Sequence, residues 1–174
     1  TGPDSAIQLD RRERCEKTNN ITTAEIQMVD KTKIPLPQPT PETAHFWAGT
    51  KNETLKLQRC DDCNNVYFPP RPFCPSCASR KVSVFDASGS ATLYSYVINN
   101  RPHPAFDGPY SIAVVELEEG PRMMSNIINC PQTPEALELD MPLEVVFESM
   151  SEEISLPYFQ PATSDSKNSD SRNQ

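Results

Sequence analysis

Four cysteines in two closely spaced pairs constrain the fold of this chain more than any other feature. The pairs are Cys60-x-x-Cys63 and Cys74-x-x-Cys77, and ten residues separate them. Each pair favours a tight turn, and the intervening segment is long enough for a short β-ribbon that brings the turns together. Four thiolates can then surround one divalent ion as a tetrahedron. The sequence therefore predicts a small metal-bound ribbon in the middle of the chain.

Other interpretations of these cysteines fit the spacing less well. Two disulfides, or four unrelated buried thiols, would not require paired spacing, and we see no secretory leader. Iron in a rubredoxin-like site is the closer rival, because a sulfur tetrahedron accepts either metal. We favour zinc because no electron-transfer partner domain is visible. Since protein fills all four ligand positions, we expect a structural ion without a catalytic role. Cys15 and Cys130 lack ligand spacing and are interpreted as free thiols.

Charge is distributed unevenly along the 174 residues, whose net charge is −8. The number of Lys and Arg residues minus the number of Asp and Glu residues gives a net charge of −1 for residues 1–50, +3 for 51–81 and −10 for 82–161. The ribbon is therefore mildly basic, and the region after it is strongly acidic. No apolar run is long enough to cross a bilayer, so we expect a cytoplasmic protein that does not bind membranes.

The pattern along the chain predicts a mainly β fold with one short helix. We expect residues 1–40 to be disordered or extended, with Met28 as a plausible natural start that would make residues 1–27 foreign to the native chain. Thr40 and Pro41 predict the start of a helix that runs to about Gly49 and partly buries Ala44, Phe46 and Trp47. This helix and the ribbon form residues 41–81 of the expected organisation, with strands around Leu55–Gln58 and Val66–Phe68.

Residues 82–162 are predicted to form a five-stranded barrel of the OB type. Short apolar stretches separated by Gly and Pro suit a small closed barrel better than a sandwich. Five or so strands are expected among six apolar stretches, which lie near Val82–Asp86, Ala91–Asn99, Ser111–Leu117, Met123–Ile128, Leu143–Glu148 and Ile154–Phe159. Residues 163–174 are rich in Ser, Asp and Asn, and we expect a disordered tail.

Several motifs in a fixed order resemble one known family. They are Arg59-Cys60-x-x-Cys63, Pro70-Arg71-Pro72-x-Cys74-Pro75-x-Cys77, Gly89-x-x-x-Leu93-Tyr94-Ser95-Tyr96, Pro109-Tyr110-x-Ile112-Ala113-Val114-Val115, Met124-x-Asn126-Ile127, Met141-Pro142-Leu143 and Leu156-Pro157-x-Phe159. Together they resemble the domain-of-unknown-function 35 family, which joins a rubredoxin-like zinc ribbon to an OB fold and is associated with acyl-CoA. The resemblance covers about residues 41–162.

Within that family, the chain is most similar to subunits that partner a thiolase-like steroid side-chain aldolase. The resemblance implies a structural Zn²⁺ held by Cys60, Cys63, Cys74 and Cys77. It also implies a two-plus-two heterotetramer with a thiolase-like subunit that carries the catalytic groups and acts on a coenzyme A thioester. The expected reaction is retro-aldol cleavage of a β-hydroxyacyl-CoA. Some relatives carry a hydratase-like domain ahead of this region, and residues 1–40 are too short to contain one.

Two groups of residues are candidates for contacts with a ligand or partner. Arg59, Arg71, Arg80 and Lys81 form a basic cluster that suits the phosphates of coenzyme A. An ordinary solvated face, or ion pairs with Asp61 and Asp62, explains the cluster equally well.

His103 and Phe106 lie in a proline-rich loop between two strands. His103 is either an exposed loop residue or a group that reaches into a partner's active site. Phe106 contacts a partner or an apolar substrate, or else plugs one end of the barrel.

The residues give little support for catalysis by this chain alone. Only two histidines are present, and no Ser/His/Asp or Cys/His order is recognisable. Glu116, Glu118 and Glu119 are better explained by solvation of a strand end. A module that binds single-stranded nucleic acid is the main alternative function, but the −10 charge of residues 82–161 opposes phosphates. A rubredoxin-like electron carrier is a third, weaker alternative.

Overall fold

The computed structural model describes residues 30–162 and is mainly β, as predicted. Its elements are η1 (Lys31–Lys33), α2 (Ala44–Lys51), β1 (Lys56–Cys60), β2 (Val66–Tyr67), β3 (Val82–Asp86), β4 (Ser90–Asn99), β5 (Tyr110–Leu117), β6 (Arg122–Ser125), β7 (Pro142–Ser149) and β8 (Ser155–Pro161). Expectations about Met28, residues 1–29 and residues 163–174 lie outside the described residues. Residues 34–40 contain neither helix nor strand, consistent with their alternating prolines.

The ribbon is a three-stranded antiparallel sheet in the order β2-β1-β3. The strand at 82–86 was predicted to belong to the barrel, and this was wrong. All five residues of β3 pair with β1, from Lys56 opposite Asp86 to Cys60 opposite Val82. β2 pairs with one edge of β1, at Gln58 and Arg59, and the opposite edge of β1 is free to pair with β3.

The barrel is a curled five-stranded antiparallel sheet in the order β6-β5-β4-β7-β8. Its two outer strands approach each other beyond the end of β6, where the Phe159 amide donates to the Asn126 carbonyl and the Ile128 amide donates to the Phe159 carbonyl. A β-bulge between Leu93 and Ser95 increases the curvature of β4. This curled sheet agrees with the predicted five-stranded OB fold.

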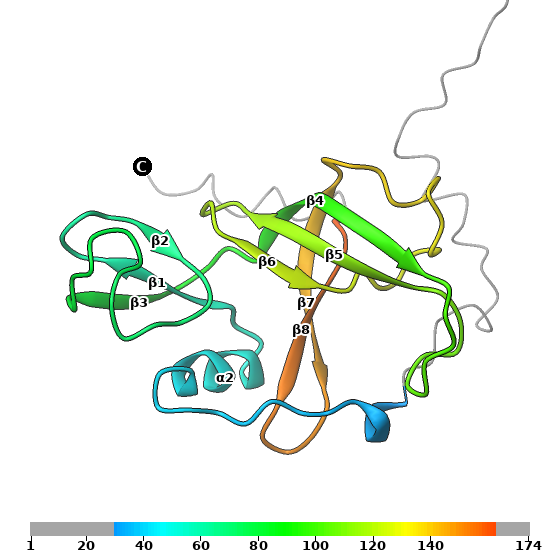
Figure 1. The fold of residues 1–174 in the computed structure, drawn as a ribbon, viewed down its shortest axis with the longest axis horizontal. Helices are drawn as coiled ribbons and strands as arrows, with labels where there is room; N and C mark the ends of the chain where they lie inside the picture. The colour runs from blue at the N-terminus through cyan, green and yellow to red at the C-terminus, as the bar shows by residue number, and fades with distance from the viewer. Residues whose placement is uncertain (1–29, 163–174) are drawn as a thin grey trace, which may run out of the picture.

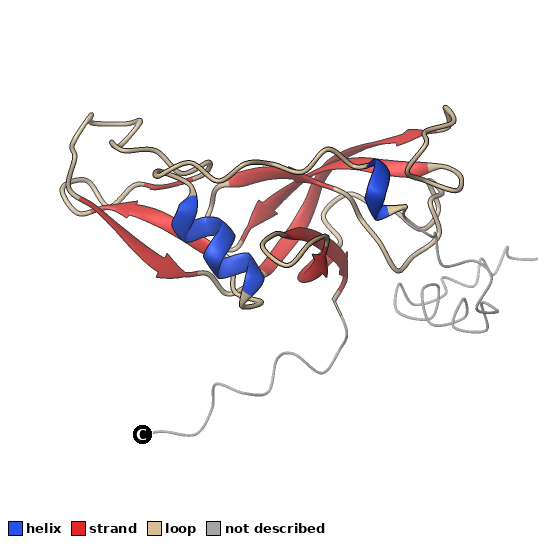
Figure 2. Cartoon of the chain, turned by 90° about the horizontal axis from the view of Figure 1, so that it is seen from below, coloured by secondary structure: helices blue, strands red, loops and turns tan. Residues whose placement is uncertain are grey.

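The helix begins later than the sequence predicted. Thr43, not Thr40, is its N-cap, because residues 40–43 form a turn in which the Thr43 amide donates to the Thr40 carbonyl. Phe46 is buried and Trp47 is half-buried, as expected, but Ala44 is exposed. The helix contacts β1, β7 and β8, and Figures 1 and 2 show it at the junction between the ribbon and the barrel.

One apolar core joins the helix, the base of the ribbon and the barrel. Phe46, Leu55 and Leu57 pack in the same cluster as barrel residues such as Leu93 and Phe159. A second, small cluster lies in the outer part of the ribbon and contains Cys60, Tyr67 and Cys74. The base of the ribbon is therefore stabilised by the barrel, whereas its outer part has few apolar contacts of its own.

None of the helices in the described part of the chain has both the length and the apolar character needed to cross a bilayer.

Candidate functional site

The two cysteine pairs lie on two turns with the same backbone hydrogen bonds. In the first turn the Cys60 carbonyl accepts from the Asn64 amide at 2.9 Å, and the Cys60 amide donates to the Asn65 carbonyl. In the second turn the Cys74 carbonyl accepts from the Ala78 amide at 2.9 Å, and the Cys74 amide donates to the Ser79 carbonyl. Asn64 and Ala78 both adopt a positive φ, 58° and 59°, which closes each turn behind its cysteines. The repeated geometry presents two thiols from each turn to the same space.

The four thiols lie in the arrangement that a tetrahedral metal site requires. All four sulfur atoms lie within 4.8 Å of one another, with Sγ–Sγ distances of 3.5 Å for Cys60–Cys77 and 3.6 Å for Cys63–Cys74. A tetrahedron with Zn–S bonds of about 2.3 Å has sulfur atoms about 3.8 Å apart. The donor set therefore fits Zn²⁺, and it leaves no ligand position for water or substrate.

The four thiols interact strongly with one another. Burial opposes ionisation of Cys74, but the backbone amides of Cys77 and Ser76 outweigh it and lower the pKa of Cys74 to about 7. The Asn65 backbone amide favours ionisation of Cys63, but the neighbouring thiols and burial together outweigh it and raise the pKa of Cys63 to about 12. Four clustered thiols cannot all ionise without a cation between them. A divalent ion removes this conflict, because its charge favours every thiolate at once.

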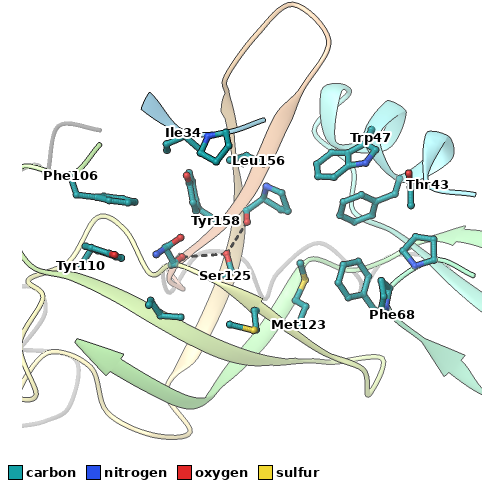
Figure 3. A pocket seen from close by; sticks show the side chains of 18 of the residues that line it. Ile34, Thr43, Trp47, Phe68, Phe106, Tyr110, Met123, Ser125, Leu156 and Tyr158 are labelled. Carbon is teal, nitrogen blue, oxygen red and sulfur yellow. Dashed lines mark hydrogen bonds between the residues drawn. The ribbon is translucent and has the colours of Figure 1, made fainter. Parts of the chain in front are cut away.

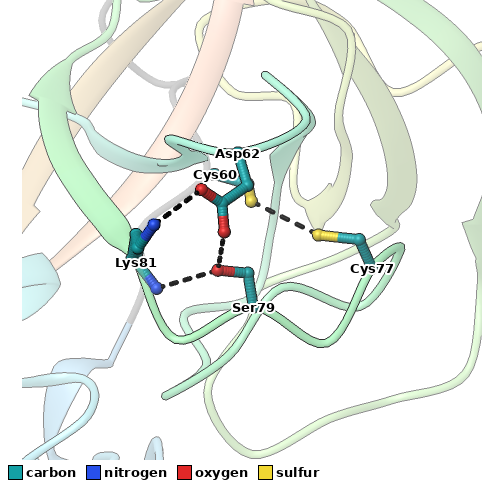
Figure 4. Close-up of polar contacts among 5 residues, drawn as sticks. All are labelled: Cys60, Asp62, Cys77, Ser79 and Lys81. Atoms are coloured by element: carbon teal, nitrogen blue, oxygen red, sulfur yellow. Dashed lines mark hydrogen bonds and ion pairs between the residues drawn. The ribbon is translucent and has the colours of Figure 1, made fainter.

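Polar contacts connect the two turns beside the sulfur atoms (Figure 4). The Asp62 carboxylate accepts from the Ser79 hydroxyl at 2.6 Å and from the Lys81 ammonium at 3.2 Å. The Ser79 hydroxyl in turn accepts from the Lys81 amide at 3.1 Å. Asp62 belongs to the first turn and Ser79 to the second, so these exposed contacts link the two turns in addition to any metal.

The predicted basic cluster consists of exposed residues with separate local contacts. Lys81 pairs with Asp62, so the ion-pair alternative holds for this residue. The Arg59 guanidinium lies 4.6 Å from the centroid of the Phe85 ring. Arg71 and Arg80 are exposed, and the Arg71 backbone amide donates to Gln58. Binding of coenzyme A phosphates by these residues stays a prediction.

An apolar groove of about 540 Å³ lies at the junction of the ribbon, the helix and the barrel. Its walls come from residues 34–35, α2, the Phe68-Pro69-Pro70 turn, the loop before β5, and strands β5, β6 and β8 (Figure 3). Trp47 and Phe68 lie at one end, and Phe106 and Tyr110 lie at the other. The aromatic residues at each end contact one another. Phe46 packs against Trp47 and Phe68 with centroid distances of 4.9 and 5.3 Å, and Phe106 stacks on Tyr110 at 4.1 Å.

His103 and Phe106 both line this groove. His103 is exposed, and its Nδ1 accepts from the Ala105 amide at 3.2 Å, which holds the ring against Phe106 and Tyr110. Phe106 is half-buried and stacks on Tyr110 in the groove wall, outside the core of the barrel. The loop therefore brings two of the predicted contact residues to one surface, whereas the basic cluster lies on the ribbon.

Other groove residues received no functional role from the sequence. Tyr110, Met124 and Tyr158 come from three strands, and Ile34 comes from the proline-rich segment. The adjacent methionines Met123 and Met124 were a weak sequence sign of an exposed apolar residue, because neighbouring residues of a strand face opposite sides of the sheet. Met123 is 5% exposed and Met124 is 69% exposed. No local pattern, however, predicts which distant segments share a groove.

The fold and the cysteine site define a zinc-ribbon protein with an attached OB fold. The family models that match are the rubredoxin-like zinc ribbon domain of ChsH2, over residues 47–83, and the C-terminal OB-fold domain of ChsH2, over residues 85–148. The chain belongs to the DUF35 family, as its motifs suggested.

The solved structure of an Ltp2-ChsH2(DUF35) aldolase contains a similar chain. The two chains are 35% identical with a TM-score of 0.66, and the match covers 74% of this chain and all of the other. A DUF35 domain-containing scaffold protein of Methanothermobacter thermautotrophicus is 36% identical over 116 residues, which are 64% of this chain and 86% of that protein.

Two further relatives have names that refer to enzyme subunits. A probable enoyl-CoA hydratase alpha subunit of Thermomonospora curvata is 34% identical over 141 residues, 80% of this chain and 44% of that protein. This chain thus spans less than half the length of that relative. The benzoylsuccinyl-CoA thiolase subunit BbsA of Thauera aromatica is 31% identical over 77 residues, 44% of this chain and 54% of that protein.

Proposed function

We propose that this chain is a zinc-binding, non-catalytic subunit of a thiolase-family complex that cleaves or forms carbon–carbon bonds of acyl-CoA thioesters. The proposal rests chiefly on the 35% identity to the chain from the Ltp2-ChsH2 aldolase, whose whole length the match covers. The thiolase subunit name of the Thauera aromatica relative supports a partner of the same kind. Within this class, retro-aldol cleavage of a steroid side-chain β-hydroxyacyl-CoA is the reaction that we propose.

The chemistry of the described residues supports placing catalysis on the partner chain. Cys60, Cys63, Cys74 and Cys77 would hold Zn²⁺ with no open ligand position, so the ion would stabilise the ribbon and would not activate a substrate. His103 uses Nδ1 to accept from a backbone amide. Burial, and secondarily the charge of Lys56, disfavours a proton on the ring of His45. Neither environment resembles a nucleophile–base pair.

The groove argues against the nucleic-acid alternative. A site for single strands combines stacking aromatic residues with Lys and Arg that track the phosphates. The groove has the aromatic residues, but no Lys or Arg is among the residues that line it. A phosphate backbone would therefore lose its hydration there without gaining a counter-charge.

Co-expression tests the proposed function directly. The full chain would be produced together with a thiolase-fold protein from the same organism, and the complex would be isolated by size exclusion. We expect a stable two-plus-two complex that cleaves a steroid β-hydroxyacyl-CoA, whereas this chain alone shows no turnover. Turnover by the isolated chain, or failure of the two proteins to associate, would contradict the proposal.

A further inference from the structure

We propose that the groove binds an uncharged, ring-bearing apolar group, which is the acyl end of a thioester and not its coenzyme. The proposal deepens the proposed function and rests on it for the choice of thioester. Under this proposal the chain contacts the substrate directly, in addition to stabilising its partner subunit.

No side chain that lines the groove carries a full charge at neutral pH as Asp, Glu, Lys or Arg would. None of the residues that line it is Asp, Glu, Lys or Arg, although residues 82–161 carry a net charge of −10. A charged group that left water for this groove would lose hydration without gaining a partner. The phosphates of a coenzyme are therefore poor occupants, and an uncharged group is a good one.

Several polar atoms in the walls are already hydrogen-bonded within this chain. The Ser125 hydroxyl donates to the Pro157 carbonyl at 2.8 Å, the Asn126 amide donates to the Ser111 carbonyl, and the Tyr110 hydroxyl accepts from Asn99 at 2.6 Å. A polar occupant would gain few hydrogen bonds in return for those it lost to water. Three donors in the walls are exceptions. Acceptance at Nδ1 leaves Nε2 of His103 to carry the proton of the neutral ring, and among the described residues neither the Trp47 indole N–H nor the Tyr158 hydroxyl has a hydrogen-bond partner. An uncharged ligand with a few acceptor atoms is thus accommodated.

The size and shape of the groove favour a ring system over a short acyl chain. Its volume of about 540 Å³ equals roughly 18 water volumes of about 30 Å³ each, which leaves more room than a short acyl chain would fill. The aromatic side chains at both ends offer flat apolar surfaces for offset or edge contacts with a rigid ring (Figure 3). Pockets of this volume are typical of small-molecule sites.

The rim of the groove is held in place from both sides. At one end the Asp30 amide donates to the Ala105 carbonyl at 2.9 Å, and the Lys31 ammonium bonds both the Ser149 carbonyl and the Glu148 carboxylate. At the other end the same segment continues into α2, which packs against β7 and β8. Such a preformed cavity loses little conformational entropy when a small ligand enters. This favours a small ligand over a protein loop as the occupant.

The single tryptophan of the chain provides the test, because Trp47 lines the groove. The full zinc-loaded chain would be titrated with progesterone, an uncharged four-ring probe, while Trp47 fluorescence is recorded. We expect a saturable change, and none with coenzyme A alone. Met124→Lys, which places a charge on an exposed groove residue, should weaken progesterone binding at least about 10-fold. Tyr94→Ala is the matched control, since Tyr94 is an exposed aromatic residue outside the groove and should leave binding unchanged.

Each outcome separates this proposal from the proposed function. No saturable signal with progesterone, or equal binding by the Met124→Lys variant, would overturn the proposal even if the complex with the thiolase-fold partner is active. If Met124→Lys prevents assembly of that complex while the isolated chain binds no progesterone, the groove is a protein contact and the proposal is wrong. Saturable binding by a chain that forms no such complex would keep the ligand site and contradict the proposed function.

Discussion

At the scale of single residues, His45 links stability to pH. Its Nε2 is buried without a hydrogen-bond partner among the described residues. Burial, and secondarily the charge of Lys56, lowers the pKa of His45 from its ordinary value of 6.5. The folded state therefore resists protonation that the unfolded chain accepts. The stability contribution of a neutral His45 is fully present above pH 6.5 and is lost as the pH falls from there toward the folded pKa.

This residue gives a prediction that urea unfolding can check. The free energy of unfolding should fall more between pH 7.5 and pH 5.5 for the native chain than for His45→Gln, because glutamine has no titrating group. Loss of zinc at low pH affects both proteins equally and cancels in the comparison. An equal fall for both proteins would show that His45 is as easily protonated in the folded state as in the unfolded state.

The residue scale also shows which site residues a sequence can identify. Cys60, Cys63, Cys74 and Cys77 were predicted together, because ligand spacing within a turn is a local property. Phe106 was predicted as a contact residue, but Tyr110, on which it stacks, was not. The stacking of Phe106 on Tyr110 depends on the conformation of the loop that leads into β5, and residue spacing does not predict that conformation.

At the scale of elements, the connection between β3 and β4 decides how the ribbon meets the barrel. Gly89 lies in this connection with φ of 79°, a conformation that L-residues rarely adopt. A Cβ at this position would lie 2.7 Å from Cγ1 of Val145. The Val145 amide donates to the Gly89 carbonyl at 2.9 Å, so the two backbones cannot easily move apart.

Replacement of this glycine should destabilise the protein through both effects. Gly120 is the matched control, because it also has a positive φ, 103°, but nothing lies within 4 Å of an added Cβ. We expect Gly120→Ala to cost about 1–2 kcal/mol from the backbone alone. Gly89→Ala should cost about 1–3 kcal/mol more, from crowding against Val145. Chemical denaturation of both variants measures the difference, and equal losses would show that the Val145 contact relaxes freely.

The assignment of β3 shows what element-scale reasoning misses. The bounds of the strand at 82–86 were predicted correctly, and its pairing with β1 was not. Alternation of apolar and polar residues identifies a strand but carries no information about its neighbours. Its partner is decided by which sheet edge remains free, and here that is the edge of β1 that β2 does not cover.

At the scale of the whole molecule, the two apolar clusters differ in what stabilises them. The larger one joins Phe46, Leu55 and Leu57 to the barrel. The smaller one, built on Cys60, Tyr67 and Cys74, is too small to offset the entropy of ordering its loops. We therefore expect zinc to supply most of the stability of the outer ribbon and little of that of the barrel.

Removal of zinc should separate the two parts. After treatment with a chelator, amides of residues 60–82 should exchange with deuterium about 10-fold faster or more, while strands β4 to β8 keep their protection. Hydrogen exchange measured by mass spectrometry, with zinc added back as the control, checks this expectation. Uniform loss of protection would mean that the ribbon and barrel unfold as one unit. No change would mean that the outer ribbon is stable without metal.

The amino-acid order alone was enough to define the metal turns, most strand positions and the zinc-ribbon-plus-OB fold. These depend on residues near one another in the chain, namely ligand spacing, alternation and turn residues. Three-dimensional packing was needed to show that β3 belongs to the ribbon and that Ile34, Trp47, Phe106 and Met124 line one groove. The physical reason is that a groove forms where segments far apart in sequence fail to fill the space between them. That space depends on how the whole chain packs.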